Sequence, residues 1–347
     1  MPRLSCILPV MDRVAEMEPT LVSLLENRPS DCEILLVLTV PYDDPYELGS
    51  EVRFLQAPPQ SDMLAAVNLA LAQVESPFIH LLSVGLAVTP QWADRALAHF
   101  TDPHVAAVAP VIRDVADSAT VLSGGWEYDR SGGPWQIGIT ELAEQTDSDP
   151  ALLPLQKKSA ARSIIAPLYQ AAFYRTMALE LLGGRLPTAC GTTWSDVDLG
   201  LMLHYIGYNA VVETSSVVLG TANTIARTPG LGYTTGRHSE ELYFRNSAHA
   251  SWLDVLVRHP LQVIGELCGS VTQPRKLLQT IGRASKWTNS SEWKKHRASL
   301  EDSRRAAASL LAQVREAQSR IDRAHDSTGS KPHFEQTPVR EQSRRAA

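Results

Sequence analysis

The chain has 347 residues, of which 44% are hydrophobic and 20% charged, and its formal net charge is −6. This is the composition of a globular protein with an ample core, and the acidic balance argues against a general nucleic-acid binder. No apolar run approaches the ~18 residues that span a bilayer, and the chain does not begin with the pattern of a signal peptide. Four cysteines without metal-type spacing indicate free thiols, so the cytoplasm is the expected location.

The first part of the chain alternates short apolar runs with helical patterns. The expected strands are residues 4–10, 33–40, 52–55, 77–83 and 104–112, and the expected helices are 20–26, 62–74 and 90–100. This alternation predicts an α/β fold with a mostly parallel, twisted sheet flanked by helices. In such sheets ligands bind beyond the carboxyl ends of the strands, here just after Val10, Val40 and Leu82.

The middle of the chain predicts further strands. Residues 120–138 are rich in glycine and tryptophan, and we expect two paired strands joined by a turn at 129–133. A strand is expected at 164–168, and two short strands at 209–219.

The last part of the chain predicts a helical extension. We expect helices at 239–258 and 260–270, and a long surface helix or helix pair at 286–323. The apolar residues at 256–267 are expected to pack on the core, with peripheral membrane contact as the alternative. The long helix could also support self-association. The predicted domains are 1–225 and 236–325, followed by a disordered tail at 326–347.

Residues 192–209 place two carboxylates, Asp196 and Asp198, ahead of an apolar helical stripe that stops at Gly207. Ser195 or Asp196 is the expected N-cap. The plain interpretation is an amphipathic helix whose acids only cap it.

This stretch resembles the segment Glu-Asp-x-Asp-Leu…Arg-x-x-Gly-Tyr of family 2 glycosyltransferases. The residues in register include Asp196, Asp198 and Gly207, whereas Ser195 stands in place of the glutamate and Met202 or a neighbour in place of the arginine. The resemblance implies that Asp196 is the general base that deprotonates the acceptor hydroxyl.

Other segments extend the resemblance over about residues 1–225. Pro9 to Asp12 are similar to the opening Pro-x-Tyr-Asn, and Asn68 matches the asparagine of an Ala-x-Asn-x-Gly helix. The resemblance implies the Rossmann-like GT-A fold and a nucleotide-sugar donor. The substrate-binding candidates that it gives are Pro9, Asp12, Thr39, Asn68, Ser83 and Asp198.

The metal motif of this family is missing. Family members carry Asp-x-Asp after the fourth strand, because a divalent cation on a diphosphate prefers carboxylate ligands. Here the fourth strand ends Ser83-Val84-Gly85, so no metal ligands are assigned and no metal cofactor is expected.

Three functions compete. The first is an inverting glycosyltransferase that moves a sugar from a nucleotide-sugar donor to the hydroxyl of a saccharide acceptor. The second is a catalytically silent GT-A protein that binds a saccharide or serves as a scaffold. The third, an unrelated nucleotide-binding protein, rests on strand order alone. The retained Asp196 favours the first, whereas the missing carboxylates favour the second.

Overall fold

The computed structural model of the chain describes residues 1–128, 134–137, 162–225, 232–247, 253, 257–269, 274–285 and 290–328. The chain divides into two compact units, residues 1–308 and 309–347. The boundary between them falls within the long helix α11 (Ser290–Thr328). The expected domain boundaries at 225 and 236 stay a prediction. Of the expected tail, residues 326–328 belong to α11, and residues 329–347 lie outside the described part of the chain.

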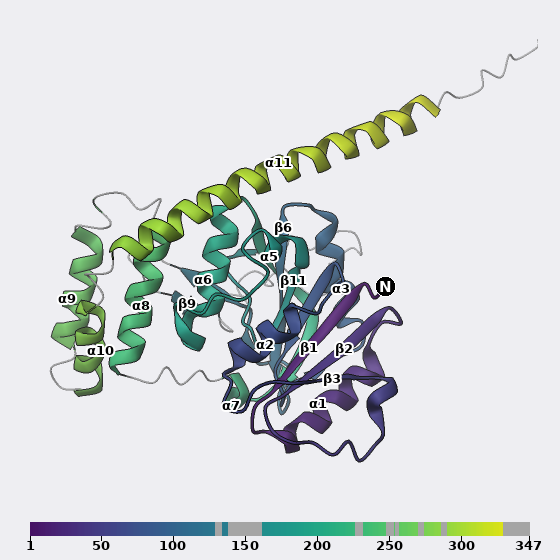
Figure 1. The fold of residues 1–347 in the computed structure, drawn as a ribbon, viewed down its shortest axis with the longest axis horizontal. Helices are drawn as coiled ribbons and strands as arrows, with labels where there is room; N and C mark the ends of the chain where they lie inside the picture. The colour runs from purple at the N-terminus through teal and green to yellow at the C-terminus, as the bar shows by residue number, and fades with distance from the viewer. Residues whose placement is uncertain are drawn as a thin grey trace, which may run out of the picture. The chain divides into compact units, whose positions relative to one another are not determined.

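A central sheet organises the first unit (Figure 1). Its strands run in the order β10-β12-β6-β11-β4-β1-β2-β3, with short β5 (Ala87–Val88) on β12 and β7 (Val121–Ser123) on β6. The bounds of the eight ordered strands are β1 Leu4–Val10, β2 Cys32–Leu38, β3 Arg53–Gln56, β4 Phe78–Leu82, β6 Val105–Asp114, β10 Arg162–Ile164, β11 Ala171–Arg175 and β12 Asn209–Gly220. Strands β1 to β4 are parallel neighbours, and β11 joins β4 to β6 in antiparallel pairing.

Helices cover both faces of this sheet. In the order of the chain they are α1 (Val14–Asn27), α2 (Met63–Leu71), α3 (Trp92–Leu97), α5 (Thr176–Glu180), α6 (Gly191–Tyr205) and α7 (Ala222–Ile225), with 3-10 turns at Leu48–Ser50 and Ala98–Thr101. The side chain of Asp62 caps α2 by accepting a 2.8 Å hydrogen bond from the backbone N–H of Ala65.

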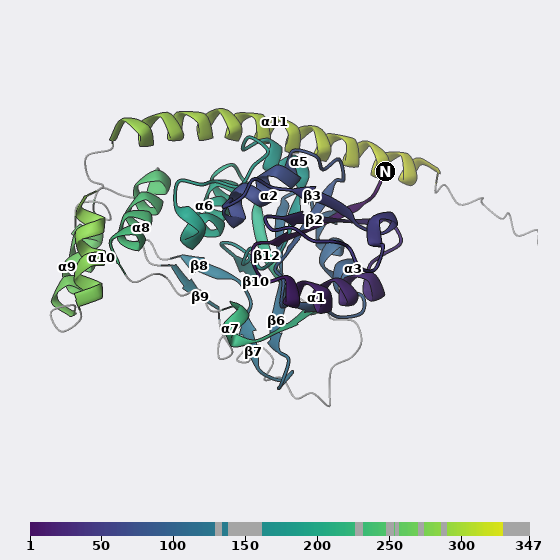
Figure 2. The ribbon, with the colours of Figure 1, turned by 60° about the horizontal axis from the view of Figure 1, so that its bottom comes forward.

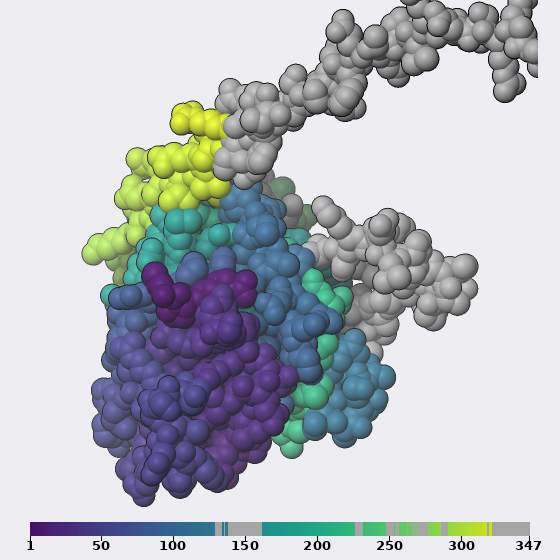
Figure 3. Space-filling view, turned by 90° about the vertical axis from the view of Figure 1, so that its right-hand side faces the viewer, coloured from purple at the N-terminus to yellow at the C-terminus, as the bar shows by residue number. Residues whose placement is uncertain are grey.

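Strand β1 shows why both faces of the sheet are apolar. Leu4 and Leu8 belong to one buried cluster with Met17 of α1 and Trp92 of α3. Because side chains alternate along a strand, Ile7 points to the opposite face, where α2 contacts β1 and β2. Figure 2 shows α2 on one side of the strands and α1 and α3 on the other. In Figure 3 the residues of the first third of the chain, drawn in purple and blue, lie side by side on the face that is turned to the viewer.

Several sequence expectations for the sheet are corrected by the structure. Residues 209–219 form one strand, β12, which changes register between Glu213 and Val217 instead of breaking in two. The strand expected at 164–168 is β10 at 162–164, followed by a single bridge at Ala166. The expected strand pair at 120–138 is confirmed as β8 (Trp126–Tyr128) with β9 (Pro134–Gln136), and the turn at 129–133 lies outside the described residues.

The helical extension begins with α8 (Tyr233–Asn246), α9 (His259–Gly269) and α10 (Pro274–Ala284), of which α10 was not predicted. Helix α8 packs on α6, and it also meets the first turns of α11, where the Phe244 and Trp293 rings stack with centroids 4.6 Å apart. The expectation that the apolar side of 256–267 packs on the core is wrong for Leu261 and Ile264, which are exposed.

Within the described residues, no helix is both long enough and apolar enough to cross a membrane. All four cysteines are free, with Cys6 and Cys190 buried. Peripheral membrane contact and self-association stay predictions.

We expect the buried His80 of β4 to make the protein sensitive to acid. Burial lowers the pKa of His80 to about 3, from an ordinary value of 6.5, and its ring stacks on Phe173 at 3.9 Å. Since the unfolded chain takes up this proton below pH 6.5 and the folded chain does not, stability falls as pH decreases from 6.5 toward 3. Between pH 6.5 and 4.5 the loss from His80 is about 2–3 kcal/mol.

Urea unfolding at a series of pH values measures this dependence. His80→Leu should flatten the decline of the unfolding free energy between pH 6.5 and 4.5, whereas replacement of the exposed His204 by leucine should leave it unchanged. A variant at position 80 with the decline of the parent protein would contradict the assignment.

Candidate functional site

Three parallel strands end side by side at one edge of the sheet. Strand β1 lies between β2 and β4, and Val10 at its end is in register with Leu38 at the end of β2. Asp12, Thr39 and Ser83 follow these strand ends, so the structure brings three of the predicted site residues to one edge. Asp12 is exposed, and the other two are half-buried.

The backbone at this edge is held by local hydrogen bonds. The Thr39 hydroxyl donates to the carbonyl oxygen of Met11 at 2.6 Å, which ties the residue after β2 to the residue after β1. The backbone N–H of Ser83 donates to the carbonyl oxygen of Gln170 at 2.8 Å. Thr39 therefore shapes the edge through its side chain, and Ser83 through its backbone.

Two other predicted residues lie elsewhere. Pro9 is buried within β1, in register with Val37, and contributes to the core. The Asn68 amide holds the loop that precedes α6, because its Nδ2 donates to the carbonyl of Leu186 at 3.2 Å and its Oδ1 accepts from the Leu186 N–H at 2.7 Å. Direct roles of Pro9 and Asn68 in substrate binding stay predictions.

Gly85 is the residue that the resemblance to family 2 glycosyltransferases aligns with the second aspartate of their metal motif. Its φ is +86°, a conformation that favours glycine, and its N–H donates to the Thr20 hydroxyl at 2.9 Å. A Cβ at this position would lie 2.6 Å from Oε2 of Glu16 and 3.4 Å from Nη2 of Arg13. These two side chains form an ion pair in which the Arg13 Nε lies 2.8 Å from Oε1 of Glu16.

The strand ends offer few ligands to a divalent cation. Ser83 and Gly85 carry no carboxylate, Glu16 beside Gly85 is paired with Arg13, and Asp12 supplies one exposed carboxylate. More generally, no cluster of three or more His, Cys, Asp or Glu side chains able to hold a metal occurs in the described ranges. The guanidinium of Arg13 thus lies beside Gly85 at this edge.

Asp196 is fully buried on α6. Its Oδ2 accepts a 2.8 Å hydrogen bond from the indole Nε1 of Trp126, and its Oδ1 accepts one of the same length from the N–H of Val197. The Trp126 ring meets that of Trp194 edge-on, with centroids 5.6 Å apart. These bonds fix the position of the carboxylate, and a general base must be held in a fixed position.

The expectation that Ser195 or Asp196 caps this helix is wrong. Helix α6 begins earlier, at Gly191, and its N-cap Cys190 makes no side-chain cap. Gly191 has a φ of +57°, and His238 of α8 fills the space that a Cβ would take, so packing of α8 sets the start of the helix. Ser195 is instead tied to Tyr169, whose hydroxyl donates to its carbonyl at 2.9 Å.

Asp198 is also fully buried, but it faces α8 through a different set of partners. Its Oδ2 lies 3.3 Å from the Nε of Arg245, and its Oδ1 accepts a 2.7 Å hydrogen bond from Nδ2 of Asn246. Asp198 therefore joins α6 to α8, and its predicted contact with substrate stays a prediction.

Sequence reasoning missed Arg13 as a site residue, and it missed the hydrogen bond that joins Trp126 to Asp196. Trp126 lies 70 positions before Asp196, and no local pattern links the two. Arg13 could have been noticed, because it follows Asp12 at the first strand end and precedes Glu16 by the three positions that pair charges on a helix.

Comparison with known proteins returned structural matches only: no family model and no curated sequence matches the chain. One similar solved structure is GalNAc-T7 with UDP, GalNAc and Mn²⁺, at 12% identity and a TM-score of 0.58. The match covers 87% of this chain and 55% of that one, so the chain spans about half the length of GalNAc-T7.

A second match is the mannosyltransferase PcManGT from Pyrobaculum calidifontis, in complex with GDP-Man and Mn²⁺. It shows 16% identity and a TM-score of 0.48, and the match covers 87% of this chain and 86% of that one. Together, the strand order, the helices on both faces and the likeness to GalNAc-T7 show that this chain has the fold of GT-A glycosyltransferases.

Proposed function

We propose that the chain is an inverting glycosyltransferase of the family 2 type, which transfers a sugar from a nucleotide-sugar donor to a hydroxyl of a saccharide acceptor. The observation that carries the proposal is that one GT-A fold holds both a strand edge with Asp12, Thr39 and Ser83 and a hydrogen-bonded carboxylate, Asp196, in the helix that resembles the family's base segment. The solved structure of GalNAc-T7 with UDP supports a nucleotide sugar as the donor class.

In the proposed reaction the acceptor oxygen attacks the anomeric carbon from the face opposite the leaving diphosphate. The new glycosidic C–O bond forms as the bond from the anomeric carbon to the diphosphate oxygen breaks, which inverts the anomeric configuration. Asp196 takes the proton of the attacking hydroxyl. Because Asp196 is buried, the acceptor reaches it only when the residues that cover it give way.

We assign neutralisation of the donor diphosphate to Arg13. Its guanidinium lies at the strand edge beside Gly85, and the side chain is 41% exposed and therefore reachable from solvent. Nε and Nη2 of Arg13 each donate one hydrogen bond to Glu16, and the remaining N–H groups of the guanidinium can donate to phosphate oxygens. Asp12 and Thr39 contact the nucleoside in this assignment.

Donor binding is therefore expected to be insensitive to divalent cations. Titration calorimetry with UDP- and GDP-sugars should give the same affinity in Mn²⁺ and in EDTA. Arg13→Gln should weaken donor binding by about 10- to 100-fold, since a charge-assisted hydrogen bond contributes about 1.5–3 kcal/mol. Replacement of Arg53, an exposed arginine that starts β3 at the opposite end of the strands, is the matched control and should have no effect.

Tight binding that requires Mn²⁺ in the unaltered protein would contradict this assignment. The double variant Arg13→Gln with Ser83→Asp provides a second check. It frees Glu16 and adds a carboxylate at the strand end, so donor binding should become dependent on Mn²⁺. Aspartate at position 85 is unsuitable, since its Cβ would collide with Glu16. If a saccharide binds but no donor supports transfer, the function is saccharide binding by a catalytically silent protein and not sugar transfer.

A further inference from the structure

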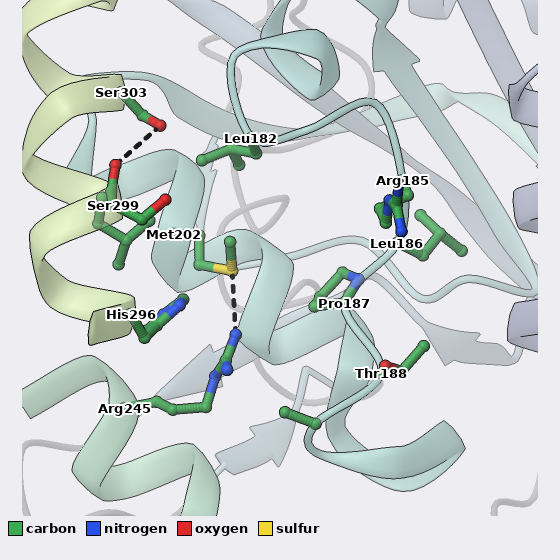
Figure 4. A pocket seen from close by; sticks show the side chains of 12 residues that line it. Leu182, Arg185, Leu186, Pro187, Thr188, Met202, Arg245, His296, Ser299 and Ser303 are labelled. Carbon is green, nitrogen blue, oxygen red and sulfur yellow. Dashed lines mark hydrogen bonds between the residues drawn. The ribbon is translucent and has the colours of Figure 1, made fainter. Parts of the chain in front are cut away.

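A cavity of about 250 Å³ lies outside the proposed transfer site, among α6, α8, the loop before α6 and the first turns of α11. Figure 4 shows Arg245 and His296 reaching into it from one side, with Arg185 and Pro187 on the other. The buried side chains of Met202 and Leu300 contribute apolar surface.

The polar groups of this cavity are suited to an anion. Two guanidinium groups, Arg185 and Arg245, line it together with the hydroxyls of Thr188, Ser299 and Ser303, and no carboxylate is among the lining residues. Asp198, which is not among the lining residues, pairs with the Nε of Arg245. The Nη2 of Arg245 is directed at the thioether sulfur of Met202 at 4.0 Å, a weak acceptor that a phosphate oxygen would readily displace.

His296 gives an independent indication of a missing partner. Its Nε2 is buried and has no hydrogen-bond partner among the described residues. Buried polar atoms are rarely left without a partner, because the loss of water is then uncompensated. Its position on the cavity wall means that a bound ligand would supply that partner.

The electrostatics around His296 agree with an anion site. Burial, followed by the positive charge of Arg245, lowers the pKa of His296 to about 4, and Arg297 acts in the same direction against the opposing effect of Asp198. Arg245 and Arg297 thus both disfavour a proton on His296, and an anion bound in the cavity would favour one.

We propose that this cavity binds a phosphate-bearing small molecule no larger than a phosphorylated monosaccharide. The volume is below the roughly 300–1,000 Å³ of sites for larger ligands, which excludes a whole nucleotide sugar. Arg185, Thr188 and Ser299 are exposed, so the ligand can enter from solvent. The proposal does not depend on the transferase function, because neither Asp196 nor the strand edge lines the cavity.

The test uses the full chain, with NMR titration of the His296 ring and calorimetry. Sulfate is the first probe, since its charge is constant between pH 4 and 8, followed by inorganic phosphate, glucose 1-phosphate and glucose. Saturating sulfate should raise the pKa of His296 by about 1, because a nearby anion favours the protonated ring, and sulfate should bind more tightly as pH falls from 6 to 4. Glucose should produce no change.

A matched pair of variants tests whether the anion binds in this cavity. Ser299→Glu puts a carboxylate at the mouth of the cavity and should weaken sulfate and phosphate binding at least tenfold, whereas Ala298→Glu, at the exposed neighbouring position, should not. Tighter binding of glucose 1-phosphate than of phosphate would identify a sugar phosphate as the ligand, and equal binding would identify free phosphate. A His296 pKa that anions leave unchanged, or equal weakening by both variants, would overturn the proposal.

Discussion

Replacement of Asp196 by asparagine is expected to lower the rate of sugar transfer by ~10²–10⁴, which is what a positioned general base contributes. Asparagine has the shape of aspartate but cannot take the proton of the attacking hydroxyl. Donor affinity should be unchanged, because the residues assigned to the donor lie at the strand edge. The measurements are initial rates of transfer and calorimetric titration of the donor.

The surroundings of Asp196 define the control. Asparagine has one acceptor oxygen, so either Trp126 or the N–H of Val197 loses its partner, and a cost of about 1–3 kcal/mol in stability is expected. Rates must therefore be compared on folded protein. Trp126→Phe removes the indole donor but keeps the carboxylate, and it should reduce transfer far less. Full activity in the asparagine variant would show that Asp196 is not the base.

The second large effect is expected on stability, at the buried pair of Asp198 and Arg245. Arg245→Met leaves the Asp198 carboxylate buried without its cation, and this should lower the free energy of unfolding by about 3–5 kcal/mol. Adding Asp198→Asn should recover much of the loss, because the uncompensated charge is then removed. Urea unfolding monitored by tryptophan fluorescence measures both changes.

An exposed pair serves as the comparison. Arg305 lies 3.3 Å from Asp302 on α11, and both side chains are more than 70% exposed. Arg305→Gln should change the stability by about 0.5 kcal/mol or less, since water already solvates both charges. Similar losses from the two arginine variants would mean that burial does not determine the strength of the inner pair.

Much of the fold could be predicted from the sequence because its signals are local. The strand Leu4–Val10 was confirmed, and so was a helix within residues 62–74, since apolar runs and apolar residues at helical spacing act over a few positions. Strand β11 was not predicted as a member of the sheet. Its place between β4 and β6 depends on partners some 65 to 95 positions away, which no local pattern records.

The same distinction applies to the site. The strand ends could be located, and Asp12, Thr39 and Ser83 follow them at one edge of the sheet, whereas their roles in binding stay predictions. The bond from Trp126 to Asp196 and the guanidinium beside Gly85 were not expected, because each depends on segments that meet only after folding. Helix α6 also starts before its polar residues, because packing against His238, and not a cap, determines where it begins.

The antiparallel strand β11 also has a consequence for how the chain is synthesised. Strands β4 and β6 each pair with β11, so β4 keeps an open edge until residues 171–175 have left the ribosome, long after β1 to β4 can assemble. An open edge of an apolar strand recruits other chains. The nascent N-terminal half is therefore the stage most exposed to aggregation and chaperone capture, and completion of β11 ends that interval.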